Sequence, residues 1–138
     1  MERSLGIIPD EYRRKHWDKI EAKIDQALVH GTGEHSASDI YDGLEEGEFL
    51  LWGGLTGDKL HSIAIINLLY FPRKKILNIM VSACDNVEVF LGEFMHQLQE
   101  FAKENECEAI RVHGRKGWMK VLEKYGFEQP YTILEKWV

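Results

Sequence analysis

The centre of the chain alternates apolar runs with tight turns, and this pattern constrains the fold more than any other feature. Strands are predicted at Glu48–Leu55, Leu60–Tyr70 and Ile76–Val81. The turns between them, Thr56–Lys59 and Phe71–Lys75, are short enough to join antiparallel neighbours. The middle run is almost continuously apolar, which is typical of a strand whose two faces are both covered. The chain therefore predicts a sheet with structure packed on each side.

Helical periodicity precedes and follows these strands. A helix is predicted from Pro9 to about residue 30, and a short one through Glu46 that begins at Ser38 or Asp39 as its N-cap. A long amphipathic helix is predicted over residues 87–105. The inner face of the long helix is expected to comprise Val87, Phe90, Leu91, Phe94, Leu98, Phe101 and Ala102.

The remaining elements complete an alternating order. Strands are predicted at Leu5–Ile8, Glu108–His113 and Tyr131–Val138, with a helix between Gly114 and Gly126. A hairpin meander followed by crossover helices implies a mixed sheet that is antiparallel first and partly parallel later. Residues 1–138 are expected to form a single α/β domain with a mixed sheet.

Composition excludes several classes of protein. The residues are 44% hydrophobic and 29% charged, an ordinary balance for a soluble domain. The net charge of −6 argues against broad binding to nucleic acid or anionic membranes. No apolar run reaches the roughly 18 residues of a membrane span, and the N-terminus has no secretory signal pattern. Cys84 and Cys107 lack metal-ligand spacing, so we expect two free, partly buried thiols and no metal.

The C-terminal block carries a family resemblance. It combines Gly114-Arg-Lys-Gly-Trp118 with Val121, Leu122 and Gly126-Phe127. This block resembles the end of the GNAT (GCN5-related N-acetyltransferase) fold, and still more the GNAT-like proteins that bacteriophages encode. The order of elements is similar along almost the whole chain. The resemblance implies a GNAT-like acyl-CoA N-acyltransferase fold. It further implies a phage or prophage origin, a place in the host cytoplasm or the virion, and a role in the particle or its assembly.

The cofactor motif of that family is altered here. The family holds the acetyl-CoA pyrophosphate at the start of the helix after the fourth strand, with a Gln/Arg-x-x-Gly-x-Gly/Ala loop. Residues 81–92 have no glycine pair, and Asp85 and Glu88 place negative charge where the pyrophosphate would lie. An N-cap role for Asp85 or Asn86 explains this stretch more simply. If a cofactor does bind, the resemblance assigns it to Val81, Ser82, Ala83, Asn86 and Val87.

The catalytic residues are also altered. In the family, a tyrosine four residues before the Gly-Phe glycine commonly protonates the departing CoA thiolate. That position is Leu122 here, which cannot donate a proton. Tyr125 follows close behind, and its helical spacing predicts a core residue. Glu48 and His61 are the other candidate acid–base groups, and neither has a partner that the sequence identifies.

Charged and edge residues suggest surfaces for partners. The basic residues are Arg111, His113, Arg115, Lys116, Lys120 and Lys124. They form either a solvated helix face or a surface for an anion or a partner, such as a CoA 3′-phosphate, nucleic acid or an acidic protein. An acidic run over residues 39–48 offers a complement for self-association. The strand expected at Thr132–Val138 would lie at a sheet edge, where it can pair with another chain.

Two functions from different classes follow. The first is a phage-type GNAT-fold protein that has lost acetyl transfer, binds no cofactor, and acts through contacts with phage structural proteins or with itself. The alternative is a divergent acetyl-CoA-dependent N-acetyltransferase that acts on an unknown amine. A host-directed inhibitor or anion-binding module that uses the basic helix is a third option. Membrane and nucleic-acid partners are not expected.

Overall fold

The chain forms one five-stranded sheet with helices on both faces. The computed structural model describes all residues except 1–2, 30, 32, 85–86, 114–117 and 131. Its elements are β1 (Arg3–Ile7), α1 (Asp10–Lys15), α2 (Trp17–Leu28), α3 (Ala37–Glu45), β2 (Leu50–Thr56), β3 (Lys59–Phe71), β4 (Lys74–Cys84), α4 (Val87–Glu104), β5 (Ala109–Val112) and α5 (Met119–Lys124).

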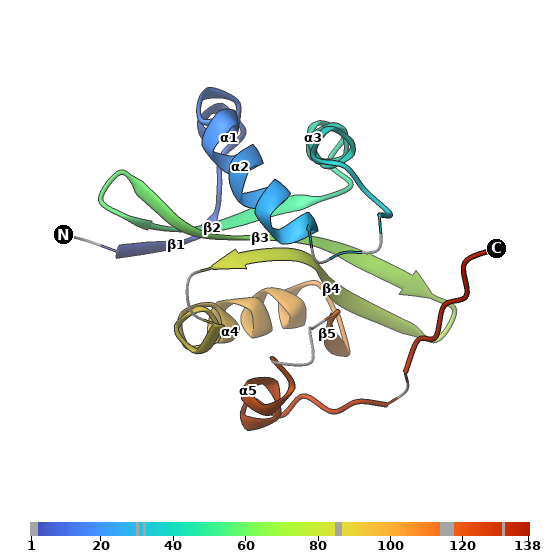
Figure 1. The fold of residues 1–138 in the computed structure, drawn as a ribbon. Helices are drawn as coiled ribbons and strands as arrows, with labels where there is room; N and C mark the ends of the chain where they lie inside the picture. The colour runs from blue at the N-terminus through green and yellow to red at the C-terminus, as the bar shows by residue number, and fades with distance from the viewer. Residues whose placement is uncertain (1–2, 30, 32, 85–86, 114–117, 131) are drawn as a thin grey trace.

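The sheet is mixed, as the sequence predicts. Its strand order is β1-β2-β3-β4-β5, with antiparallel pairing from β1 to β4 and parallel pairing between β4 and β5. Helices α1, α2 and α3 cover one face, and α4 and α5 cover the other (Figure 1). A parallel neighbour requires a crossover connection, and α4 is that connection.

The two faces bury two separate cores. On β3, Ile63 and Ile65 face the core under α2 and α3, which we call the α2-side core. Ala64 and Ile66 face the core under α4 and α5, which we call the α4-side core. All four side chains are fully buried. Because successive residues of a strand point to opposite faces, a strand between two cores is apolar throughout. The continuous apolar run in the sequence has this cause.

The helices before the sheet differ in detail from the prediction. The single helix expected from Pro9 is broken at His16, whose φ of −110° and ψ of 24° separate α1 from α2. The N-cap of α3 is Ser36, and the expectation of Ser38 or Asp39 was wrong. Ser36 Oγ accepts a hydrogen bond from the Asp39 N–H at 3.1 Å, and Asp39 Oδ2 accepts one from the Ser36 N–H at 2.9 Å. This reciprocal capping box lowers the pKa of Asp39.

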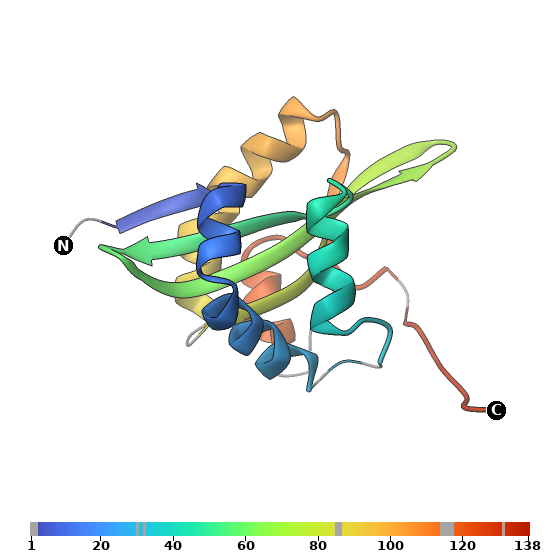
Figure 2. The ribbon, with the colours of Figure 1, turned by 90° about the horizontal axis from the view of Figure 1, so that it is seen from above.

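The prediction of a last strand at Tyr131–Val138 was wrong. Thr132–Val138 has no regular secondary structure, and Tyr131 lies outside the described residues. Helix α5 ends where predicted, because Gly126 adopts a left-handed φ of 85° just beyond it. A strand needs a hydrogen-bonded neighbour as well as a suitable sequence, and this segment has none in the described chain. Figure 2 shows it leading away from the sheet.

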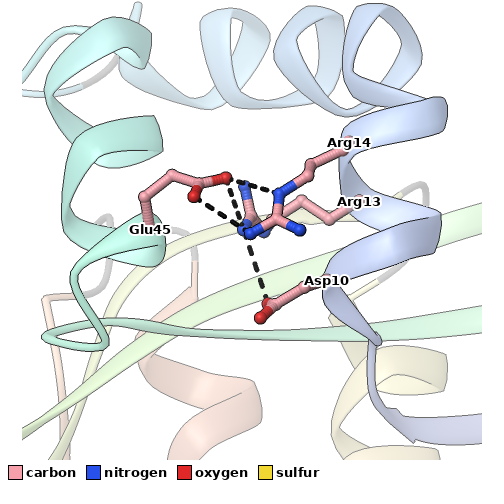
Figure 3. A network of polar contacts seen from close by, with 4 residues as sticks. All are labelled: Asp10, Arg13, Arg14 and Glu45. Carbon is pink, nitrogen blue, oxygen red and sulfur yellow. Dashed lines mark hydrogen bonds and ion pairs between the residues drawn. The ribbon is translucent and has the colours of Figure 1, made fainter.

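A buried arginine joins α1 to α3. Arg13 is 1% exposed, and its Nη2 donates to Glu45 Oε1 at 2.9 Å and to Asp10 Oδ1 at 3.4 Å (Figure 3). Arg14 adds a two-point contact to the same glutamate, at 2.8 Å from Nε to Oε1 and 3.0 Å from Nη2 to Oε2. The Arg13 guanidinium also lies over the Tyr41 ring. Hydrogen bonds from Arg14 and Arg13 lower the pKa of Glu45 to about 2.

Replacing Gly53 with alanine should destabilise the protein. A Cβ at Gly53 would lie 2.8 Å from Ile8 Cδ1 and 3.0 Å from Leu60 Cδ1, both in the packed α2-side core. Overpacking of this kind costs about 1–3 kcal/mol in the free energy of unfolding, which urea denaturation measures. Gly92→Ala is the matched control, because a Cβ there meets only Tyr125 Oη at an ordinary 3.5 Å. Equal destabilisation by the two changes would contradict this packing.

Replacing Glu45 with glutamine should destabilise the protein in a pH-dependent way. The pKa of Glu45 falls from 4.5 to about 2 on folding, so its ion pairs stabilise the folded chain fully above pH 4.5. As the pH drops from 4.5 towards about 2, the unfolded state takes up the proton first and this stabilisation is lost. Urea midpoints should therefore differ most at neutral pH and converge in acid. Glu46→Gln is the control. A difference in urea midpoint between wild type and Glu45→Gln that does not change with pH would contradict this role of the Glu45 ion pairs.

Candidate functional site

The sheet opens between β4 and β5. The two strands pair from Ile76 with Ala109 to Ile79 with Val112, whereas β4 continues beside β3 as far as Cys84. On its β5 side, the stretch Met80–Ala83 therefore has no partner strand in the described part of the chain. Helix α4 begins just beyond this stretch. The result is a free strand edge that ends at the start of a helix.

A β-bulge lies at the point where the strands part. In the β3–β4 register Ile66 pairs with Ile79 and Ile65 pairs with Val81, which leaves Met80 without a partner. Consequently Ile79 faces the α4-side core, whereas Val81, two residues later, faces the α2-side core. A bulge takes the backbone N–H and C=O of its extra residue out of the ladder, and bulges are frequent beside active sites. No side-chain pattern in the sequence indicated this feature.

Helix α5 packs against the first half of α4, beside the opening. Lys124 Nζ lies 3.3 Å from Glu88 Oε1, and Tyr125 Oη lies 3.5 Å from where a Cβ on Gly92 would be. At 1.5 Å per residue, Gly92 is about 7.5 Å along α4 from its first residue. The prediction of Tyr125 as a core residue was wrong, because its side chain is 37% exposed. Leu122 is buried in the α4-side core.

The structure places the predicted cofactor residues in different environments. Val81 and Ala83 point into the α2-side core, so only their backbone can reach a ligand. Ser82 is half-buried and pairs with Ala64, which places it on the α4 face of the sheet. Asn86 lies outside the described residues. Val87 is the first residue of α4, and its side chain is not among those described.

The three candidate acid–base residues are not brought together. Glu48 is exposed before β2, Tyr125 is the C-cap of α5, and no hydrogen bond or ion pair joins either of them to His61. His61 is the extra residue of a second bulge, between the pairs Gly54–Ser62 and Leu55–Leu60. Its Nδ1 lies 3.1 Å from the Ser62 hydroxyl oxygen, and its buried Nε2 has no partner among the described residues. The half-buried His61 ring therefore lies over Gly54 of the neighbouring strand.

The predicted basic surface is divided between two places. Arg111 lies over the Phe71 ring at the tip of the β3–β4 hairpin, whereas Lys124 contacts α4. A shallow hollow of about 490 Å³ at the hairpin is lined by Phe71, Pro72, Arg73, Lys74 and Arg111. His113 and Lys120 are exposed, and Arg115 and Lys116 fall outside the described residues.

Other site classes find no support in the described residues. No cluster of three His, Cys, Asp or Glu side chains there could hold a metal ion. Cys84 and Cys107 are half-buried and not joined in a disulfide, as predicted, and burial raises the pKa of Cys107. No helix in the described ranges has the length and apolar character needed to cross a bilayer.

Several solved acetyltransferases share this architecture, as does a structure described as a transcriptional regulator from Bacillus halodurans. No family model and no curated protein matches the sequence. An aminoglycoside N-acetyltransferase in complex with CoA superposes with a TM-score of 0.73 at 10% identity, covering 99% of this chain and 95% of that one. A GNAT family acetyltransferase from Staphylococcus aureus gives 0.72 at 12% identity, covering 100% of both chains. A predicted acetyltransferase with acetyl-CoA from Clostridium acetobutylicum gives 0.69 at 15% identity, covering 97% and 96%.

The chain therefore has a GNAT-like fold. The resemblance of the C-terminal block predicted this fold, and the similarity extends over the whole length of the chain. Identities of 10–16% establish the architecture and leave activity and substrate to be argued from the site.

Replacing Leu122 with alanine should destabilise the protein strongly. Leu122 is 7% exposed and packs under α4, so truncation leaves a cavity and costs about 2–5 kcal/mol in the free energy of unfolding. Lys120→Ala on the exposed side of the same helix is the control and should change stability by less than about 0.5 kcal/mol. Chemical denaturation measures both, and a neutral Leu122→Ala would show that this position is not part of the core.

Proposed function

We propose that this protein is a divergent acetyl-CoA-dependent N-acetyltransferase. The observation that carries the proposal is the free edge of β4 at Met80–Ala83, with its bulge at the end of β5. The likeness to solved acetyltransferases, two of them described with acetyl-CoA or CoA, supports it. The same observations favour this alternative over a protein without cofactor, because the free edge offers backbone groups to a ligand although the glycine motif is absent.

The residues at the opening suit an extended, partly polar ligand. Backbone groups of Met80–Ala83 would hold a pantetheine arm much as they would hold a neighbouring strand, without any side-chain signature. The positive end of the α4 dipole lies just beyond this stretch and would favour the phosphates. Glu88 opposes this locally, but its pairing with Lys124 offsets the charge. When bound, acetyl-CoA supplies an activated acyl group for an amine nucleophile.

Tyr125 is an exposed group for proton transfer beside the opening. In a transfer to an amine, the nitrogen forms a bond to the acyl carbon and releases a proton to solvent, the carbon–sulfur bond breaks, and the thiolate takes a proton from a donor that solvent then reprotonates. Tyr125, which is exposed and lies against α4 at Gly92, would donate that proton. It would serve in place of the family position, which the buried Leu122 occupies.

Binding and turnover test this proposal together. Calorimetry should give a dissociation constant for acetyl-CoA between about 1 μM and 1 mM, and thioester cleavage should appear with some member of a panel of amines. Tyr125→Phe should lower kcat about 100-fold with unchanged cofactor affinity, because only the proton donor is lost. Tyr70→Phe, which removes an exposed hydroxyl at the distant hairpin, is the matched control. Absence of binding at about 1 mM would contradict the proposal.

A non-catalytic protein that acts through contacts is the second candidate. It is favoured by the buried leucine at the usual acid position and by the carboxylate of Glu88 in the first turn of α4. The phage origin, the role in a virion and the protein partners implied by the resemblance remain predictions. Absence of both acetyl-CoA and CoA binding in calorimetry would favour this candidate.

A further inference from the structure

The turn between β3 and β4 is the end of a projecting hairpin. β2 begins at Leu50, opposite Ile66, whereas β3 runs on to Phe71, so the hairpin extends about 17 Å beyond β2. Residues 71–74, which we call the tip, are Phe71, Pro72, Arg73 and Lys74, and all of them are exposed. Neither Arg73 nor Lys74 forms an ion pair with a described residue. The tip therefore joins an exposed aromatic ring to unbalanced positive charge.

A hollow of about 240 Å³ lies beside the end of β1, between α1 and the end of α3. Its apolar lining includes Ile7, Phe49 and Leu50, and its acidic lining is Asp10, Glu45 and Glu46. Ile7 is 49% exposed, so the hollow leaves apolar surface in contact with water. It has room for a large side chain and is bordered by carboxylates.

The charge beside this hollow is negative. Asp10 and Glu45 are paired with the arginines of α1, whereas Glu46 forms no ion pair in the described chain. Asp42, one turn earlier, and Glu48, just after it, are exposed and likewise form no ion pair with the residues that the structure describes. The tip and the hollow are thus opposite in charge, and each exposes apolar surface. Complementary potentials of this kind steer association and select the partner.

The tip cannot reach the hollow of its own chain. β3 and β4 stay paired as far as Phe71 with Lys74, so the hairpin is a two-stranded ribbon held by its ladder. Figures 1 and 2 both show it extending away from α1, on the far side of α3. A surface that complements the tip is therefore available only on another molecule.

We propose that two copies of this chain form a two-fold dimer in which the tip of each enters the hollow of the other. Phe71 packs against the apolar lining of the hollow, and Arg73 and Lys74 face Glu46. The contact is reciprocal, so it satisfies both surfaces of both copies and closes after two subunits. It is small, and we expect a dissociation constant of about 10–100 μM. The proposal does not depend on acetyl transfer.

The mass of the full chain over a range of concentrations tests the proposal. Sedimentation velocity between about 5 and 500 μM should show a monomer that converts to a dimer. Lys74→Glu should raise the dissociation constant at least about tenfold, because it places a like charge against Glu46. Lys59→Glu is the matched control, since Lys59 is also the exposed first residue of a strand after a tight turn. It should dimerise like wild type.

Mixing two variants identifies the contact. Glu46→Lys should weaken the dimer as Lys74→Glu does, because it too brings like charges together. An equimolar mixture of these two variants should dimerise with nearly the wild-type affinity. In the mixed dimer, one contact is unchanged and the other has both of its charges reversed. Both side chains are exposed and lie outside the two cores, so each variant should keep its fold, which urea midpoints check.

Three results would overturn the proposal. The first is a wild-type chain that stays monomeric up to about 500 μM or forms assemblies larger than a dimer. The second is a Lys74→Glu variant that dimerises as tightly as wild type. The third is a mixture of Lys74→Glu and Glu46→Lys that associates no more tightly than either variant alone.

Discussion

The pairing of β4 is the constraint on which the rest of the structure depends. This strand is antiparallel to β3 along nearly its whole length and parallel to β5 over only four residue pairs. The bulge at Met80 reverses the alternation of faces along this strand, so that Ile79 faces one layer of helices and Val81, two residues later, faces the other. Where the parallel pairing stops, a backbone edge is left free at the start of α4. The opening therefore exists because β5, the shortest of the described strands, pairs with only part of β4.

The sequence predicted the elements whose signals are local. Periodicity located β2, β3 and α4 to within about two residues, and glycine and aspartate at residues 57 and 58 marked the hairpin turn. It failed where the outcome depends on distant partners. The break at His16 places α1 so that Arg13 reaches Glu45, thirty-two residues away in the chain. Residues 132–138 have strand propensity, but a strand forms only when it is paired, and no strand pairs with them in the described residues.

The sequence placed a candidate cofactor site at residues 81–87 but did not indicate the free edge there, because that edge is built from backbone. Neither the family's glycines nor its tyrosine stands at the expected position, so the sequence favoured a protein without cofactor and kept a divergent enzyme as the alternative. A bulge has no side-chain signature, so nothing in the residues around Met80 indicated it. Tyr125 was assigned to the core by extending the helical period, but α5 ends at Lys124 and the C-cap turns the ring outward, against Gly92. A period predicts burial only while the helix continues.

The charge at the start of α4 decides whether a pyrophosphate can bind there. Counted alone, Glu88 would repel a pyrophosphate, which was the strongest argument against a cofactor. In the structure it is paired with Lys124, and both side chains are more than half exposed, so the pair itself contributes little to stability. An anion at the start of α4 could therefore draw the Lys124 ammonium towards itself at small cost to the fold. The residue that seemed to exclude the cofactor thus holds a cation beside the place where the phosphates would bind.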